Sequence, residues 1–314
     1  MHSTFLQLDP FELVKVQGPD ARKFLQGQVS CNLDDLSPSQ SLSGALCNLK
    51  GRVISDFRLM QLGDDCYLQL ESGLGSVVKA VLDKYIVFSK AKTSLVSSRF
   101  ARYGLLGNDA HRLLTEIFAS SPVVDGRVVQ ERNISIIKIA GLVPRYEIWV
   151  DLDSASSSDS DVIATIRLSS LSATGADWTR EDMRAGIVHI EAGMTEIYLP
   201  QQLNYDLSGL INFKKGCYTG QEIVARMYYR SMARKRLYYL LAGNIDCVPE
   251  KYICHLENGS EQRNEVLKML KDSEGNCHVL AILPVEAVES KNGFYFPGRQ
   301  QEVALMSQPL PYLP

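Results

Sequence analysis

The residues best suited to chemistry lie together in one short run, residues 212–226, which reads Asn-Phe-Lys-Lys-Gly-Cys-Tyr-Thr-Gly-Gln-Glu-Ile-Val-Ala-Arg. In this run Cys217 directly follows Lys214, Lys215 and Gly216. Thiolate is the reactive form of cysteine, and nearby ammonium groups stabilise it. The run therefore predicts a reactive thiol at Cys217.

A helix is expected directly after this cysteine. Thr219 and Glu222 have the S/T-x-x-E spacing of a capping box, which places a helix start at about Thr219. The positive end of that helix dipole would favour the thiolate further. A simpler alternative is open at this level: the glycines only allow a tight turn, and Cys217 is a small buried apolar side chain.

The same region is strongly basic. Between residues 214 and 236 there are seven Lys or Arg and one acid, Glu222, which gives a local formal charge of +6. Arg226, Arg230 and Arg234 recur every four residues and so share one helix face. This face is either an ordinary solvated surface or a landing place for an anion, such as a polyglutamate tail or a nucleic-acid backbone.

Nearby tyrosines bear on that choice. A nucleic-acid surface carries exposed aromatic rings among its cations. Tyr218, Tyr228 and Tyr229 stand at suitable places in the sequence, although rings at these spacings can equally pack inward. Direct binding of a nucleic acid is thus one hypothesis for this region.

The N-terminal part of the chain repeats one pattern. Residues 18–21, Gly-Pro-Asp-Ala, follow a β-prone segment and open a helix, and residues 107–110, Gly-Asn-Asp-Ala, do the same. We expect an α+β fold in which two similar, interleaved α+β halves pack together within residues 1–235. In residues 236–314, short β-prone runs alternate with turn signals such as Asn258-Gly259, which predicts a small antiparallel β-barrel.

The composition is that of an ordinary globular protein. The 314 residues are 45% hydrophobic and 22% charged, and a formal net charge of −3 argues against a chain that binds nucleic acid over its whole surface. No apolar run is long enough to cross a bilayer, and residues 1–5 show no secretion signal. Seven scattered cysteines favour a reduced, cytoplasmic chain over a disulfide framework. We expect a monomer without a metal site.

The central run resembles the signature of the YgfZ family, folate-binding relatives of the glycine-cleavage aminomethyltransferase, or T-protein. The matching residues are Lys214, Lys215, Gly216, Cys217, Tyr218, Thr219, Gly220, Gln221, Glu222 and Arg226. Four other segments are similar to the opening motif, the glycine turn, the following helix and the C-terminal end of the family, namely residues 16–29, 48–52, 82–85 and 309–312. The resemblance implies a three-part T-protein-like fold with a central folate pocket. It also implies a role in maintaining iron–sulfur enzymes, including those that thiolate tRNA.

The resemblance also points to site residues. The two folate-stacking aromatic positions of the family fall on Phe11 and Trp178, which makes tetrahydrofolate or a one-carbon-substituted folate the expected cofactor. T-proteins carry paired aspartates, one of which acts in aminomethyl transfer, and the matching place here is Ser55-Asp56, so Asp56 alone is left as a catalytic candidate. Arg184 stands where T-proteins hold a pterin-binding glutamate. Both departures speak against glycine-cleavage chemistry.

Three hypotheses follow, in order of preference. The first is a folate-binding accessory protein that supports iron–sulfur proteins, and through them tRNA modification, with a working thiol at Cys217. The second is a folate-dependent one-carbon transferase of unknown substrate that uses Asp56 and Cys217. The third is direct binding of tRNA by the basic face of residues 214–236.

Overall fold

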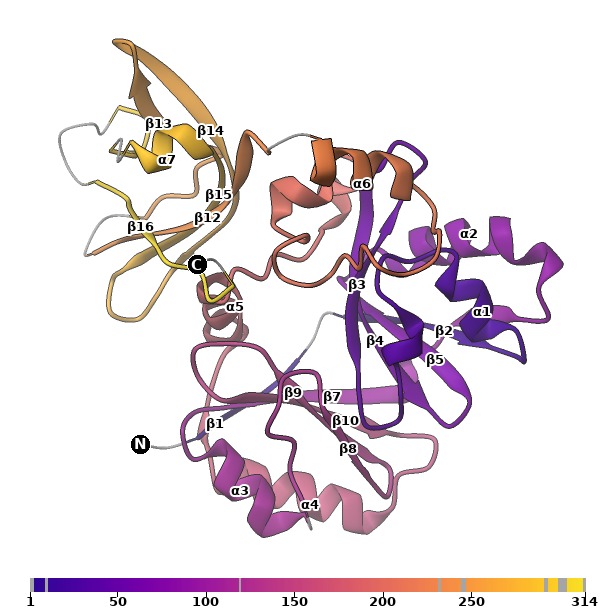
Figure 1. Ribbon diagram of the computed structural model, residues 1–314. Helices are drawn as coiled ribbons and strands as arrows, with labels where there is room; N and C mark the ends of the chain where they lie inside the picture. Colours follow the sequence, from indigo (N-terminus) through magenta and orange to yellow (C-terminus); the bar gives the residue numbers. More distant parts are fainter. Residues whose placement is uncertain are drawn as a thin grey trace. The chain divides into compact units, whose positions relative to one another are not determined.

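The computed structural model describes residues 3–8, 11–118, 120–230, 233–243, 247–290, 293–298 and 304–312. These residues form an α+β fold with sheets of five, six and five strands (Figure 1). They divide into two compact units. The first unit comprises residues 1–175, 189–198 and 209–223, and the second comprises residues 176–188, 199–208 and 224–314. These units interleave along the sequence. The domain boundary that the sequence predicts, between residues 235 and 236, stays a prediction.

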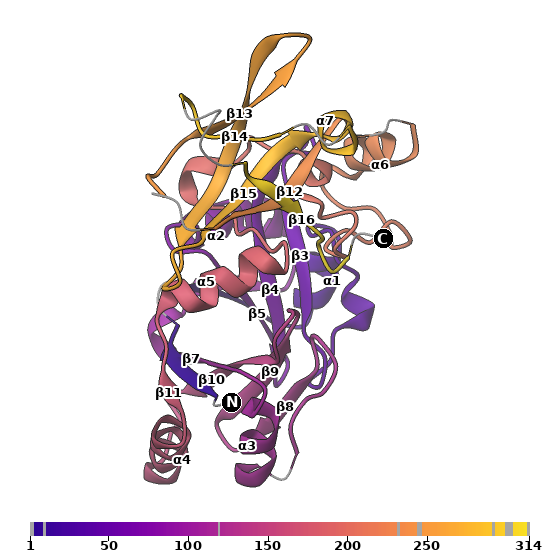
Figure 2. The ribbon, with the colours of Figure 1, turned by 90° about the vertical axis from the view of Figure 1, so that its left-hand side faces the viewer.

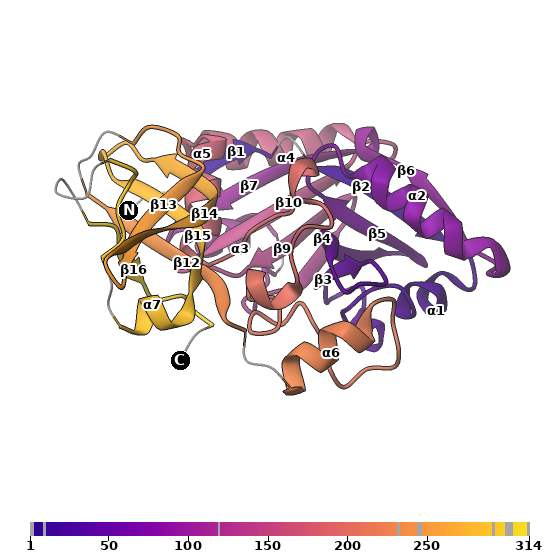
Figure 3. The ribbon, with the colours of Figure 1, turned by 90° about the horizontal axis from the view of Figure 1, so that it is seen from above.

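One half of the first unit is a five-stranded antiparallel sheet in the order β3-β4-β5-β2-β6. Its elements, in chain order, are β2 (Glu12–Gln17), α1 (Ala21–Gln26), η1 (Leu33–Asp35), β3 (Leu42–Cys47), β4 (Val53–Leu62), β5 (Asp65–Leu70), α2 (Gly75–Tyr85), η2 (Ile86–Phe88), β6 (Lys92–Leu95) and η3 (Ser97–Arg99). Figure 3 shows α1 and α2 beside this sheet.

The other half is a six-stranded sheet in the order β8-β9-β10-β7-β1-β11, antiparallel except where β1 and β11 run parallel. Its elements are β1 (Thr4–Gln7), β7 (Phe100–Leu106), α3 (Ala110–Ile117), β8 (Val128–Glu131), β9 (Ile134–Ile139), β10 (Arg145–Asp151), α4 (Ser157–Leu168) and β11 (Leu171–Ser172). Figure 2 shows α3 and α4 side by side against this sheet.

The two halves share one topology, which confirms the prediction made from the repeated sequence pattern. The run β2-α1-β3-β4-β5-α2-β6 corresponds to β7-α3-β8-β9-β10-α4-β11, and β1 lies between β7 and β11. Gly18 and Gly107 have φ of 116° and 120°. Their carbonyls accept hydrogen bonds of 3.0 Å from the backbone N–H of Ala21 and Ala110, respectively. L-residues rarely adopt such φ values, so the repeat of these glycines is a requirement of the backbone.

Apolar side chains explain how the halves are built. Leu114 of α3 and Ile166 of α4 pack against strand residues such as Ile136, so the helices cover one face of the six-stranded sheet. The two sheets also touch each other, because the rings of Tyr67 and Phe100 meet edge to face with centroids 5.5 Å apart. The two sheets of the first unit therefore pack directly against each other.

The second unit is built on a curled antiparallel sheet in the order β13-β14-β15-β12-β16, the predicted C-terminal β unit. Its elements are α5 (Gly175–Arg184), η5 (Pro200–Leu203), α6 (Gln221–Arg230), β12 (Lys235–Ala242), β13 (Tyr252–Glu257), β14 (Ser260–Lys271), β15 (Cys277–Pro284), α7 (Val285–Glu289) and β16 (Met306–Gln308). The first residues of α5 and α6 belong to the first unit. The first unit also contains the 3₁₀ helix η4 (Ala192–Met194). The predicted turn at Asn258-Gly259 joins β13 to β14 with positive φ at both residues, 49° and 76°.

One expectation is wrong. Cys247 and Cys277 form a disulfide with a Cα–Cα distance of 5.6 Å, although the cysteine count favours a reduced chain. Ala242, at the end of β12, pairs with Cys277 of β15, and Cys247 follows five residues later in the sequence. A disulfide depends on the distance between two cysteines in the folded chain, and the number of cysteines does not give that distance. Among the described residues, no helix has both the length and the apolar character needed to cross a membrane.

Candidate functional site

Lys215 clamps the signature run onto the loop after α1. Its Nζ donates hydrogen bonds to the backbone carbonyls of Gln26, Val29 and Cys31, at 2.8, 2.6 and 2.7 Å. Burial lowers the pKa of Lys215 to about 8. The three N–H groups of the ammonium are therefore used inside the fold, and this lysine acts as a structural clip between two motifs that lie far apart in the sequence.

Gly220 joins the signature run to a third motif, the glycine turn at residues 48–52. Its φ is 83°, and a Cβ at this position would overlap the carbonyl oxygen of Asn48. Only glycine satisfies both conditions. Because Gly220 is left-handed, the helix α6 begins at Gln221, two residues later than predicted. Thr219 forms no capping box. Its hydroxyl instead donates to Oε1 of Gln28 at 3.3 Å, and its N–H donates to the carbonyl of Gly27 at 3.2 Å.

Neighbouring residues of the signature face opposite ways. Tyr218 is buried, and its hydroxyl has no hydrogen-bond partner among the described residues. Cys217 is exposed, as are Lys214 and Gly216. The alternative in which Cys217 is a small buried side chain is therefore wrong for this structure.

Cys217 is distinct among the cysteines, all seven of which lie in the described residues. Four other thiols are free but buried, namely Cys31, Cys47, Cys66 and Cys254. Burial raises the pKa of Cys31 and Cys47 to about 12, and that of Cys66 and Cys254 to about 11. These four are inert thiols at neutral pH, so Cys217 is the thiol that a reagent or a partner can reach.

A second cluster of the first unit contains two predicted site residues. Asp56 on β4 is 6% exposed, and its Oδ2 accepts a hydrogen bond of 2.7 Å from Nδ1 of His189. Its Oδ1 accepts the backbone N–H of Ile190, also at 2.7 Å. The ring of His189 meets the half-buried ring of Phe11 edge to face, with centroids 5.7 Å apart. The fold thus brings together Phe11 and Asp56, which the sequence treats separately.

Arg102 on β7 completes this cluster. Its guanidinium lies 5.8 Å from the centroid of the Phe11 ring and donates to the backbone carbonyl of Phe11. The cluster combines an aromatic ring, an imidazole, a carboxylate and a guanidinium. Such a set can bind a flat, polar heterocycle and can move a proton through the imidazole.

Trp178 lies in the second unit, on α5, and its ring is 4% exposed. Stacking of a ligand on this ring requires that the side chains covering it move. On the same helix, Nη1 of Arg184 pairs with Oε1 of the buried Glu181 at 2.9 Å. Arg180 pairs with Glu181 as well, at 3.3 Å. Arg184, which stands at the place of the T-protein glutamate, is therefore held by a carboxylate one turn earlier.

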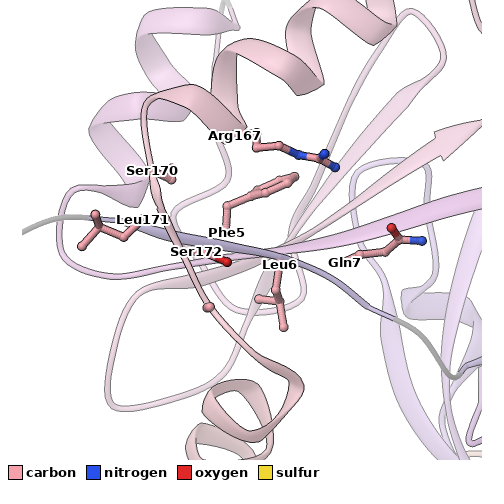
Figure 4. Close-up of a pocket in the computed structure, with 8 residues that line it drawn as sticks. Phe5, Leu6, Gln7, Arg167, Ser170, Leu171 and Ser172 are labelled. Atoms are coloured by element: carbon pink, nitrogen blue, oxygen red, sulfur yellow. The ribbon is translucent and has the colours of Figure 1, made fainter.

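A cavity of about 340 Å³ opens elsewhere in the first unit, between β1, β11 and the end of α4 (Figure 4). The Arg167 guanidinium lies 5.7 Å from the centroid of the Phe5 ring, which lines this cavity with Gln7 and Ser172. None of the site residues predicted from the sequence lines it. No group of three or more His, Cys, Asp or Glu that could hold a metal occurs among the described residues.

Comparison with known proteins assigns the chain to a family. The tRNA-modifying protein YgfZ of Edwardsiella ictaluri is 32% identical over 285 residues, which cover 89% of this chain and 84% of that protein. The chain belongs to the YgfZ family. Another YgfZ, from Yersinia enterocolitica, is 30% identical over 313 residues, which cover 98% of this chain and 92% of that protein. The family model of the GCVT N-terminal domain matches residues 2–142.

The YgfZ fold is also that of a known enzyme. The glycine cleavage system aminomethyltransferase T of Bartonella henselae superposes with a TM-score of 0.80 over 99% of this chain and 86% of that protein, at 15% sequence identity. At this identity the likeness establishes the shared fold. It agrees with the T-protein-like architecture expected from the signature of this YgfZ chain.

Sequence reasoning missed two residues of the Phe11 cluster. His189 is a single histidine in residues 186–190, and no spacing links it to Asp56, which lies 133 residues earlier. Arg102 is one of several charged residues around β7 and carries no motif. Both reach Phe11 only through tertiary contacts between segments far apart in the sequence, so neither could have been found from local patterns.

Proposed function

We propose that this chain is a cytoplasmic, folate-binding accessory protein that supports iron–sulfur enzymes and thereby tRNA modification, with Cys217 as its working thiol. The observation that carries the proposal is the exposure of Cys217 on a loop that Lys215 and Gly220 fix to two other motifs. A thiol held at the surface by a rigid loop is suited to act on a partner protein. We expect a monomer, whose clients include tRNA-thiolating enzymes.

The cluster around Phe11 fits a reduced folate. Its ring offers a stacking surface, and His189 and Asp56 supply hydrogen-bonding groups beside it. A bound tetrahydrofolate, or a one-carbon-substituted form, would supply a carrier of one-carbon groups. Phe11 would position the pterin. Trp178 stays a folate-stacking residue proposed from the family resemblance.

The test separates the thiol from folate binding. The gene would be expressed in a bacterium that lacks its own YgfZ, and thiolated nucleosides of tRNA would be measured by mass spectrometry. We expect Cys217→Ser to lose this support while calorimetry shows unchanged binding of tetrahydrofolate. Arg263→Ala, at an exposed position outside the signature, is the control and should support thiolation fully. Full support by Cys217→Ser would refute the role of the thiol.

The Asp56–His189 pair favours a second function, folate-dependent one-carbon transfer. A carboxylate that holds an imidazole is an arrangement that many enzymes use for proton transfer. Release of the labelled carbon from methylene-tetrahydrofolate to a partner protein would be the assay. Undiminished turnover by Asp56→Asn would remove Asp56 from this mechanism.

A further inference from the structure

The outer face of α6 carries arginines and tyrosines together. Val224 is fully buried and fixes the inner face of this helix. Arg226 and Arg230, four residues apart, are exposed and lie on the opposite face, and Tyr229 lies to one side of them with 68% of its surface exposed. The sequence leaves open whether these tyrosines are exposed or packed inward. In the structure, Tyr228 and Tyr229 of α6 are exposed, whereas Tyr218 is buried.

The cations of this face are available. In the part of the chain that the structure describes, no carboxylate forms an ion pair with Arg226, Arg230 or Arg234. Two other basic residues of the region are used internally. Lys215 donates to three carbonyls, and Arg236 forms two hydrogen bonds of 3.0 Å with Asp206. The free positive charge of the region is therefore concentrated on α6 and the residues that directly follow it.

The exposed rings separate this face from an ordinary solvated helix. Tyr228 is 45% exposed and meets Tyr229 edge to face, with centroids 5.1 Å apart. A helix face that only needs solubility gains nothing from two exposed aromatic rings. An exposed ring beside arginines that form no ion pair is an arrangement with which proteins bind single-stranded nucleic acids, because a base stacks on the ring and the guanidinium groups neutralise phosphates.

We propose that the outer face of α6, formed by Arg226, Tyr229 and Arg230 and extended by Arg234, binds single-stranded RNA. The phosphates lie on the arginines and a base stacks on Tyr229. An acidic protein segment would also match the charge, but it would make no use of the aromatic faces. The surface lies outside the Phe11 cluster, so the proposal does not depend on folate binding or on the thiol.

The test measures binding of a fluorescein-labelled, unstructured RNA of about 12 nucleotides to the full chain by fluorescence anisotropy. The logarithm of the association constant should fall linearly with the logarithm of the salt concentration, and the slope should lose about 1.4 in the double variant Arg226→Ala/Arg230→Ala, because each phosphate contact contributes about 0.7. Tyr229→Ala should weaken binding between about 5-fold and about 150-fold, whereas Tyr229→Phe should bind as the wild type does.

Arg263→Ala is the matched control, since Arg263 is an exposed arginine of the second unit on β14. It should change neither the affinity nor the slope. Absence of RNA binding, or binding that is insensitive to salt, would overturn the proposal, as would equal loss of affinity in the control. Binding of poly-L-glutamate more tightly than the RNA, lost in the same arginine variant, would assign the face to an acidic protein partner instead.

Discussion

Nδ1 of His189 lies 2.7 Å from Oδ2 of Asp56, although 133 residues separate them in the chain. A carboxylate can only accept, so Nδ1 of His189 donates the hydrogen bond to Asp56. The second carboxylate oxygen is fixed by the N–H of Ile190. Asp56 is therefore a positioning residue, and His189 is the group of this pair that a bound ligand would meet.

Asp56→Asn should reverse the tautomer of His189. The amide oxygen can still accept the N–H of Ile190, which turns the amide NH₂ towards the ring and makes Nδ1 the acceptor. Long-range ¹H–¹⁵N NMR of the imidazole nitrogens reports this change directly. The variant should also be less stable by about 1.5–3 kcal/mol, because a hydrogen bond to a charged group is lost. An unchanged tautomer would show that Asp56 does not hold the ring.

Folate binding should depend on the ring of Phe11. Phe11→Ala should weaken binding of tetrahydrofolate between about 2-fold and about 12-fold, because an aromatic contact contributes roughly 0.5–1.5 kcal/mol. Calorimetry measures this effect, and quenching of tryptophan fluorescence compared between wild type and Trp178→Phe tests the second ring. Phe11→Tyr keeps a stacking face and serves as the control. If Phe11→Ala binds as tightly as the wild type does, the folate site lies elsewhere.

Alkylation should single out Cys217. At pH 8 one thiol per chain should react quickly with iodoacetamide, and Cys217→Ser should abolish this fast phase. The buried thiols stay protonated at this pH because their pKa values are raised to about 11 or 12, and thiolate forms only as the pH approaches those values. Mass spectrometry of the labelled peptides identifies the site. A fast phase that survives in Cys217→Ser would contradict this assignment.

Lys215→Met should destabilise the first unit. The substitution leaves the carbonyls of Gln26, Val29 and Cys31 without their shared donor, and buried polar groups without a partner cost about 1–3 kcal/mol each. We expect a loss of at least about 2 kcal/mol in urea-induced unfolding. Lys214→Met removes the same charge from an exposed position and should change the stability by less than about 0.5 kcal/mol. Equal effects of the two substitutions would argue against the clip.

Reduction should weaken the second unit. The Cys247–Cys277 disulfide closes a loop over a sequence separation of 30 residues, and bridges of this kind contribute about 2–4 kcal/mol. Addition of dithiothreitol should lower the free energy of unfolding of the wild type by this amount. Cys247→Ser should start at the lower stability and show no response to the reductant. A wild type that is indifferent to dithiothreitol would mean that the two thiols are not joined in solution.

The two α+β halves, the family and the hairpin in the C-terminal part could be predicted from short stretches of the sequence. The repeat around Gly18 and Gly107 predicts the two α+β halves, because both glycines meet the same backbone requirement. The order of the signature residues indicates the family, and the turn at Asn258-Gly259 predicts a hairpin. Each of these features depends on residues that are close in sequence, where propensity and turn geometry decide the structure.

The tertiary structure decided which side chains meet and which face the solvent. Nothing in the sequence pairs His189 with Asp56 or brings Cys247 to Cys277, since those contacts join segments that are far apart in the chain. The same holds for the signature, where Cys217 faces outward because Tyr218 packs inward and Gly220 turns the chain against Asn48. The sequence specifies the order of the functional side chains, whereas their burial and orientation depend on the residues that pack around them in the folded protein.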